Sequence, residues 1–148
     1  MRQISKSLED TTIIANQLVG LILKQIKTDQ ATVIGLYGDL GAGKTTLTQA
    51  LAKSLGVKNR VVSPTFVIMK SYRLKVKSYK LLIHIDAYRL ERPEELLNLG
   101  WAAILADPKN LILIEWPERV SSIMPLHTKV HFCHRGENCR EIIINKVL

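Results

Sequence analysis

Apolar residues near the start of the chain recur at the spacing of an α-helix. They fall on one helical face, which predicts an amphipathic helix that is capped by Ser7 or Asp10 and runs to about Lys27. The apolar positions on this face are Ile14, Leu18, Leu21, Ile22 and Ile26. One side of the helix is therefore expected to pack against a core.

Two segments are apolar almost throughout, residues 32–37 and residues 110–115. Continuous apolar runs of this length are typical of strands that are buried on both faces of a sheet. Further strands are predicted for residues 66–74 and 79–86, which a basic turn joins. Residues 129–134 and 140–145 are expected to form a terminal hairpin around Arg135–Asn138.

Two more helices are predicted between these strands. Residues 44–55 form the first, which Gly56 ends, and the second begins at Pro93 and stops at Gly100. The order of strands and helices is that of an α/β fold with one central sheet and no internal repeats. The hairpins near the end of the chain indicate that this sheet is mixed and not purely parallel.

The composition is that of one globular domain. The chain has 148 residues, of which 47% are hydrophobic and 23% are charged. A chain of this length buries roughly 70% of the surface that it exposes when unfolded, so a core and a cleft can form. We therefore expect a single domain over residues 1–148, with no segment left for a separate substrate domain.

The chain contains only two cysteines, Cys133 and Cys139. Two are too few for the disulfide framework of a small secreted protein. Together with His131 and His134 they lie close in sequence, but their spacing is not that of a usual structural zinc site. We therefore expect no zinc.

The sequence shows no signal that would target the protein outside the cytoplasm. The first residues lack the apolar core of a signal peptide. The longest uncharged stretch, residues 11–23, is shorter than the roughly 20 apolar residues of a membrane span. We expect a cytoplasmic protein without a membrane partner.

A phosphate-binding motif follows the first apolar strand. Residues 38–45 match the pattern G-x4-G-K-[ST] in full, and a predicted helix follows them. Glycines allow backbone N–H groups to approach phosphate oxygens, and the start of the helix adds partial positive charge. Lys44 would reach the β- and γ-phosphates, and the Thr45 hydroxyl is a hard oxygen ligand that suits Mg²⁺. The candidate nucleotide-binding residues are Gly38, Asp39, Leu40, Gly41, Ala42, Gly43, Lys44, Thr45 and Thr46.

Two of the predicted strands end in a carboxylate, Asp86 and Glu115. If both strands run parallel to residues 32–37, these carboxylates emerge at the same sheet edge as Gly38, where α/β sheets bind ligands. A phosphate loop needs a nearby carboxylate to hold Mg²⁺ directly or through water. One of the two can serve the metal while the other orients or deprotonates the attacking water, and the residues alone leave this assignment open.

A hydroxyl-bearing loop lies between the helix and the first acidic strand, at Ser63, Pro64, Thr65 and Phe66. Nucleotide switches place a hydroxyl that senses the γ-phosphate and Mg²⁺ in this part of the chain. Ser-Pro is also common turn chemistry, so the loop alone is a weak signal.

Taken together, these motifs resemble the TsaE family of small bacterial ATPases, which act in threonylcarbamoyladenosine modification of tRNA. The resemblance extends from about residue 8 to residue 120. It rests on residues 38–46, on residues 63–66, on His84–Arg89, on Pro93–Leu96 with Gly100, and on Leu113–Pro117. The phosphate loop alone would be unspecific, whereas the full set in this order and spacing is specific.

The resemblance implies a P-loop NTPase fold, a three-layer domain around a mixed, mostly parallel sheet of about seven strands. It implies ATP and Mg²⁺ as ligands, with Thr45 and Glu115 linked to the metal and Asp86 important for hydrolysis. Thr65 would lie in a switch-like loop, and the segment at Thr11 and Thr12 near the nucleotide base. The family's ATPase supports turnover of the modification enzyme through a complex of TsaD and TsaB, with tRNA as a candidate partner through that complex.

The charge balance adds a candidate interaction surface. The net charge is +8, and five basic residues crowd one predicted hairpin. They are Lys70, Arg73, Lys75, Lys77 and Lys80. Such a run is often a solvated edge that resists aggregation, and it can also contact RNA phosphates or an acidic partner.

Three other functions compete with an ATPase that serves tRNA modification. A small-molecule kinase would need an Arg-rich lid and an acceptor pocket, for which the chain leaves no segment. A GTPase switch is disfavoured because no Asp-x-x-Gly follows Asp86. A nucleotide-gated binding module with incidental hydrolysis stays open, because its motifs would be the same.

Overall fold

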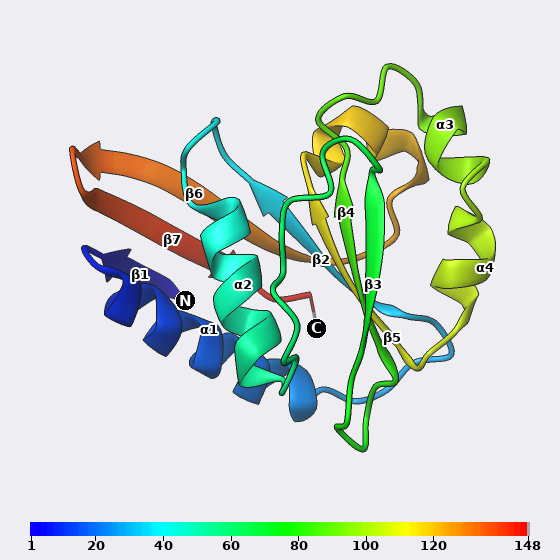
Figure 1. Cartoon of the computed structure of the whole chain (residues 1–148), viewed down its shortest axis with the longest axis horizontal. Coiled ribbons are helices and arrows are strands. Elements are labelled where there is room, and N and C mark those ends of the chain that lie inside the picture. Colours follow the sequence, from blue (N-terminus) through cyan, green and yellow to red (C-terminus); the bar gives the residue numbers. More distant parts are fainter. Residues whose placement is uncertain (148) are drawn as a thin grey trace.

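The computed structural model describes residues 1–147, which form seven strands, four α-helices and one 3-10 helix. Figure 1 shows their arrangement around one sheet. The elements in chain order are β1 (Arg2–Ser5), α1 (Leu8–Leu23), β2 (Thr32–Tyr37), α2 (Lys44–Ser54), β3 (Met69–Arg73), β4 (Leu81–Asp86), α3 (Pro93–Leu97), α4 (Trp101–Ala106), β5 (Asn110–Glu115), η1 (Pro117–Ile123), β6 (Thr128–Gly136) and β7 (Cys139–Asn145).

The seven strands form one mixed sheet in the order β1-β7-β6-β2-β5-β4-β3. The four inner strands β6, β2, β5 and β4 pair in parallel. Strand β3 pairs antiparallel with β4, and β7 pairs antiparallel with both β6 and β1. Five of the strands therefore run in one direction and two, β3 and β7, in the other, so the expected mixed and mostly parallel sheet of the P-loop NTPase fold is confirmed.

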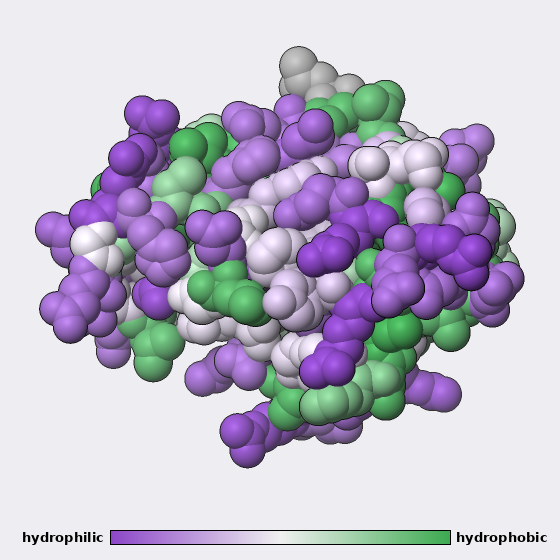
Figure 2. Space-filling model, turned by 90° about the horizontal axis from the view of Figure 1, so that it is seen from above, coloured by the Kyte–Doolittle hydropathy of each residue, from purple (hydrophilic) through white to green (hydrophobic). Residues whose placement is uncertain are grey.

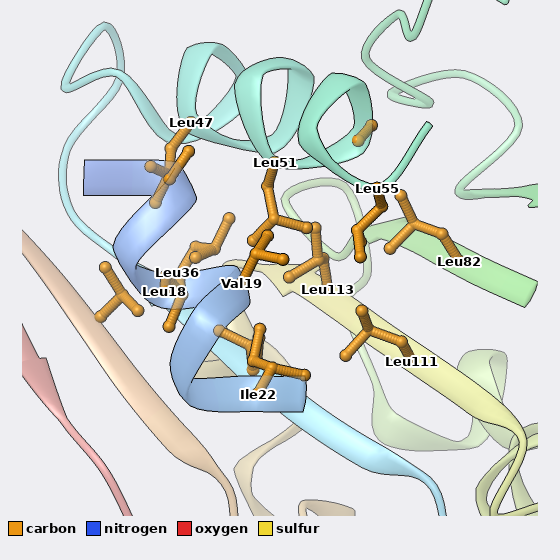
Figure 3. Packing of buried hydrophobic residues seen from close by; sticks show 14 of the residues in the cluster. Leu18, Val19, Ile22, Leu36, Leu47, Leu51, Leu55, Leu82, Leu111 and Leu113 are labelled. Carbon is orange, nitrogen blue, oxygen red and sulfur yellow. The ribbon is translucent and has the colours of Figure 1, made fainter. Parts of the chain in front are cut away.

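Helices cover both faces of the sheet, which makes three layers. Along β5, Leu111 and Leu113 belong to the core under α1 and α2, whereas Ile112 and Ile114 belong to the core on the side of α3, α4 and η1. Figure 3 shows the first of these cores, where leucines of α2 meet α1 and the sheet. The alternation arises because successive side chains of a strand point to opposite faces.

The two apolar runs of the sequence coincide with β2 and β5, and β4 begins only slightly later than residue 79. Helix α1 begins after Ser7, whose hydroxyl accepts a bond from the Asp10 amide at 3.1 Å, but it ends at Leu23 and not near Lys27. The difference arises because Ile26 is not part of the buried face: its side chain is 89% exposed.

Strand β3 starts at Met69, three residues later than the apolar pattern predicts. The preceding residues form a turn instead, in which Ile68 adopts a positive φ of 67°. Helical periodicity likewise missed that the chain resumes a helix beyond Gly100. That glycine, with φ of 89°, separates α3 from α4, and the side chain of Trp101 is buried directly after it. The short strand β1 and the helix η1 also carry no clear sequence pattern.

The surface of the molecule is mixed in character. Figure 2, which views the molecule from the top of Figure 1, shows small hydrophobic areas that hydrophilic residues separate. Among the residues that the structure describes, no helix combines the length and apolarity needed to cross a membrane.

Candidate functional site

Parallel pairing brings the motif-bearing segments to one edge of the sheet. Strands β2 and β4 both pair in parallel with β5, where Glu115 lies opposite Leu36 on one side and Asp86 on the other. The loop 38–43 leaves this same edge directly after β2. The expectation that the two carboxylates emerge beside the phosphate loop is therefore confirmed.

The loop itself depends on its glycines. Gly43 has a φ of 105° and is the N-cap of α2, and Gly38 has a φ of 150°. At Gly38 a Cβ atom would lie 3.0 Å from the Phe132 side chain and backbone, so any larger residue would require a shift. These positions let the chain turn sharply from β2 into α2, whose first N–H groups have no acceptor within the helix. Such a helix start is a site where anions bind.

Lys44 lies inside the turn that this loop makes. It is 5% exposed, and its Nζ donates to the carbonyl oxygen of Asp39 at 2.9 Å and to that of Gly38. The Nζ also lies 4.2 Å from the centre of the Trp116 ring. Burial lowers the pKa of Lys44 below its ordinary value of 10.5, although nearby carboxylates oppose this shift. Those carboxylates are Glu115, Glu118, Asp86 and Asp39.

Glu115 is tied to the phosphate loop and to β4. The Thr45 hydroxyl donates to its Oε1 at 3.0 Å, and the other carboxylate oxygen lies 3.4 Å from the same hydroxyl. The Nε2 of His84 lies 2.8 Å from Oε1. Both Glu115 and His84 are buried, which strengthens these interactions relative to water.

Asp86 has a different set of partners. The hydroxyls of Ser63 and Thr65 donate to its Oδ2 at 3.2 and 3.1 Å, and the Tyr88 amide donates to its Oδ1 at 3.0 Å. The Ser63 and Thr65 hydroxyls are 2.8 Å apart. The loop that the sequence marked as switch-like is thus bound to Asp86, whereas the phosphate loop is bound to Glu115.

These groups border one cleft of about 310 Å³. Its walls come from the phosphate loop, the start of α2, the loop at Ser63 and the ends of β4 and β5. The lining residues are Leu40, Gly41, Ala42, Gly43, Lys44, Thr45, Thr46, Ser63, Thr65, Asp86, Tyr88, Glu115, Trp116 and Arg140. Most of the residues that the sequence singled out therefore lie in one place.

A second cleft of about 330 Å³ shares Gly43, Thr46 and Arg140 with the first. Thr11 lines this second cleft, and its hydroxyl lies 2.8 Å from that of Ser5. Thr11 therefore lies next to the phosphate loop, and its place near the nucleotide base stays a prediction. The neighbouring Thr12 is exposed and bonds to the carbonyl of Leu8 instead.

The sequence did not single out Arg140 or His84 as candidate site residues, although both contact the site. Arg140 of β7 lies against Gly43 and donates to the Gly41 carbonyl at 3.3 Å, but only the pairing of β7 with β6 reveals this. His84 could have been found, because it stands two residues before Asp86 on the same strand and so faces the same side. Its contact with Glu115 follows from the parallel register of β4 and β5.

The donor set fits a nucleoside triphosphate with a divalent cation. The start of α2 and Lys44 offer N–H groups and positive charge for phosphate oxygens. Thr45 and Glu115 offer neutral and anionic oxygen atoms about 3 Å apart, which is the chemistry that Mg²⁺ prefers. The fold and this constellation define the chain as an α/β domain of the P-loop NTPase class.

Comparison with known proteins identifies the family within this class. The family model described as threonylcarbamoyl adenosine biosynthesis protein TsaE matches residues 5–142. This chain therefore belongs to the TsaE family.

Several curated relatives are named tRNA threonylcarbamoyladenosine biosynthesis protein TsaE. The Nostoc relative is 38% identical over 127 residues, which cover 83% of this chain and 75% of that protein. The Treponema pallidum relative is 34% identical over 128 residues, which cover 86% and 87% of the two chains. The Haemophilus influenzae relative is 38% identical over 104 residues, or 70% of this chain, and the match spans only 63% of that protein's length.

A solved structure has the same fold. The crystal structure of Bacillus subtilis YdiB superimposes with a TM-score of 0.76 at 28% sequence identity. The match covers 100% of this chain and 86% of that chain. The likeness thus includes the terminal strands β6 and β7, which the sequence motifs do not reach.

The lowered pKa of Lys44 predicts a pH-dependent stability. Because the unfolded chain holds this proton more tightly than the folded chain, the charged amine disfavours folding at neutral pH. This penalty disappears as Lys44 loses its proton. The unfolding free energy of the wild type, relative to that of Lys44→Met, should therefore rise as the pH increases from neutral toward the ordinary lysine pKa of 10.5. Urea unfolding of both proteins without nucleotide measures this difference.

The exposed Lys53 of α2 provides the control for this measurement. The variant Lys53→Met keeps the buried amine and should follow the wild type at each pH. A difference between wild type and Lys44→Met that stays constant or falls with pH would contradict the expected effect.

Proposed function

We propose that this chain is a Mg²⁺-dependent ATP hydrolase that is required for threonylcarbamoyladenosine modification of tRNA next to the anticodon. One observation carries the proposal: Lys44, Thr45, Asp86 and Glu115 line a single cleft at the start of α2. A phosphate loop, a hydroxyl ligand and two carboxylates are the parts that P-loop hydrolases use. In this proposal residues 1–148 act as one ATPase domain.

Different residues of the cleft bind the phosphates and the metal. The loop amides and Lys44 hold the phosphates, and Lys44 exchanges its bonds with the loop carbonyls for bonds to phosphate oxygens. Thr45 and Glu115 would hold Mg²⁺, directly or through its water molecules. When bound, the metal neutralises charge on the phosphates and favours loss of the terminal phosphoryl group.

Asp86 acts on the attacking water. It orients the water toward the γ-phosphorus and accepts the proton as the new P–O bond forms and the bond to the ADP oxygen breaks. Its Oδ2 already accepts two hydroxyl donors, so the carboxylate is held in one orientation. Thr65, one of these donors, couples the position of its loop to the state of the terminal phosphate.

The second cleft takes the base and sugar end of the nucleotide. It adjoins the phosphate loop through Gly43 and Thr46, and Thr11 lies in its wall. We propose ATP over GTP because the chain lacks the Asp-x-x-Gly motif of GTPase switches after Asp86. Arg140 lies between the two clefts and adds positive charge near the phosphates.

The pathway assignment follows from the family and its named relatives. We propose that the chain acts in the cytoplasm with a TsaD–TsaB complex, whose turnover it supports, and meets tRNA through that complex. Three exposed apolar side chains support a protein partner near the nucleotide. Leu40, Phe66 and Val67 are 64%, 85% and 59% exposed, and they belong to the two loops that border the cleft.

The basic hairpin is the second surface for this complex. Lys70, Arg73, Lys75, Lys77 and Lys80 are all exposed, and none forms an ion pair within the part of the chain that the structure describes. Free positive charge on an edge strand and its turn suits the phosphates of tRNA or an acidic face of the partner complex.

Removal of either carboxylate should separate hydrolysis from binding. In Asp86→Ala and Glu115→Ala we expect ATP turnover to fall by about 10²-fold, because the water or the metal loses its partner. The dissociation constant for ATP measured in EDTA, without metal, should change by less than about threefold, because the loop and Lys44 are intact. Turnover assays and calorimetric titration measure the two effects.

The matched control for this test is Glu94→Ala, which removes an exposed carboxylate of α3 outside the cleft. It should hydrolyse ATP like the wild type. Normal turnover in both cleft variants would overturn the assignment of Asp86 and Glu115.

Neutralising the hairpin should weaken complex formation in a salt-dependent way. We expect the variant with Gln at all five basic positions to bind the TsaD–TsaB complex more weakly than wild type, with or without tRNA. This loss of affinity should be larger at low salt than at high salt. The double variant Lys24→Gln, Lys129→Gln is the control for charge elsewhere on the surface. An unchanged slope of affinity against salt in the hairpin variant would reject this surface.

A further inference from the structure

The buried imidazole of His84 lies directly behind the proposed metal site. Its side chain is fully buried on β4, on the same face of the strand as Asp86. Its Nε2 lies 2.8 Å from Oε1 of Glu115, and its Nδ1 has no hydrogen-bond partner among residues 1–147. The proposed binding and hydrolysis of ATP assign no role to this residue.

The register of the sheet explains how the two side chains meet. His84 lies opposite Leu113 on β5, so Glu115, two residues further along the same face, is its diagonal neighbour. Diagonal neighbours on one face are within reach of long side chains such as histidine and glutamate. The contact therefore depends on the same parallel pairing that brings Asp86 beside Glu115.

The chemistry of the pair sets the direction of the bond. A carboxylate has only acceptor atoms, so the hydrogen of this contact is on Nε2 of His84. His84 is thus a donor with a fixed orientation, because the ring is packed inside the sheet and cannot turn toward water.

The hydrogen bond from His84 determines which carboxylate oxygen of Glu115 is available to a cation in the cleft. Oε1 accepts from both His84 and Thr45, at 2.8 and 3.0 Å, whereas Oε2 lies 3.4 Å from the Thr45 hydroxyl alone. If the Thr45 hydroxyl turns to a cation, His84 still holds Oε1, so the carboxylate keeps its orientation. Residues behind a metal ligand that act in this way orient the ligand and raise its affinity for the metal.

We propose that His84 is a positioning residue, which holds Glu115 through the Nε2 to Oε1 hydrogen bond in the orientation that binds the hydrated divalent cation. The inference rests on the proposed function, because it assumes that Glu115 serves a metal. It concerns a hydrogen bond and not a contact with ATP, so it predicts an effect on metal affinity and none on metal-free nucleotide binding.

Two substitutions separate this role from simple packing. His84→Leu fills a similar volume without a donor, and because it leaves the buried Glu115 carboxylate with one donor fewer, it is expected to lower stability, so folding is measured separately. His84→Gln can place an amide N–H near the position of Nε2 and so restore the bond. Leu82→Val is the matched control, because Leu82 is fully buried on the same face of β4 and lies in the apolar core.

The experiment measures Mn²⁺ binding to each variant in the presence of saturating ADP, with the free ion detected by electron paramagnetic resonance. We expect His84→Leu to bind Mn²⁺ about tenfold more weakly than wild type, and His84→Gln and Leu82→Val to remain within about threefold of it. A cooperative melting transition of His84→Leu well above the assay temperature, and unchanged ADP affinity in EDTA, would show that the loss is not one of folding.

Two results would overturn the inference while leaving the proposed function intact. One is wild-type Mn²⁺ affinity in His84→Leu, and the other is an equal loss in His84→Gln and His84→Leu when both are folded. A wild-type chain that binds neither ADP nor Mn²⁺ with ADP would overturn the proposed function itself, and this inference with it.

Discussion

The parallel pairing of β2, β5 and β4 is the constraint on which the rest of the site depends. It aligns Leu36, Glu115 and Asp86 across three strands, so that the phosphate loop and both carboxylates leave the sheet at one edge. The apolar runs that fill these strands pack against helices on both faces, which fixes the register over their whole length. A shift of one residue would turn both carboxylates toward the opposite core.

The same pairing gives the two carboxylates different surroundings. Glu115 is held from the phosphate loop by Thr45 and from within the sheet by His84, whereas Asp86 is held by the loop at Ser63 and Thr65. One carboxylate is therefore bonded to the phosphate loop and to the neighbouring strand, and the other is bonded to a separate loop that carries two hydroxyl groups. This difference supports the division into a metal-linked Glu115 and a water-directed Asp86, which the sequence left open.

Local patterns predicted the strands, the phosphate loop and the acids at the strand ends, because each is encoded in a short stretch of chain. They missed β1 and the contact of Arg140 with Gly41, because both require segments about 100 residues or more apart to pair. They placed the end of α1 too late, since the exposed Ile26 fits the helical period without joining the core. The role of His84 depends on the register between β4 and β5, which no single strand reveals.

We propose that the cleft hydrolyses ATP in support of a partner complex. The most direct measurement is steady-state ATP turnover by the purified chain with Mg²⁺, alone and with a TsaD–TsaB complex. We expect slow turnover by the chain alone and a large increase when the complex is added. Binding of ATP without any increase in turnover would indicate a nucleotide-gated module instead. Absence of both binding and turnover would contradict the proposed ATPase function.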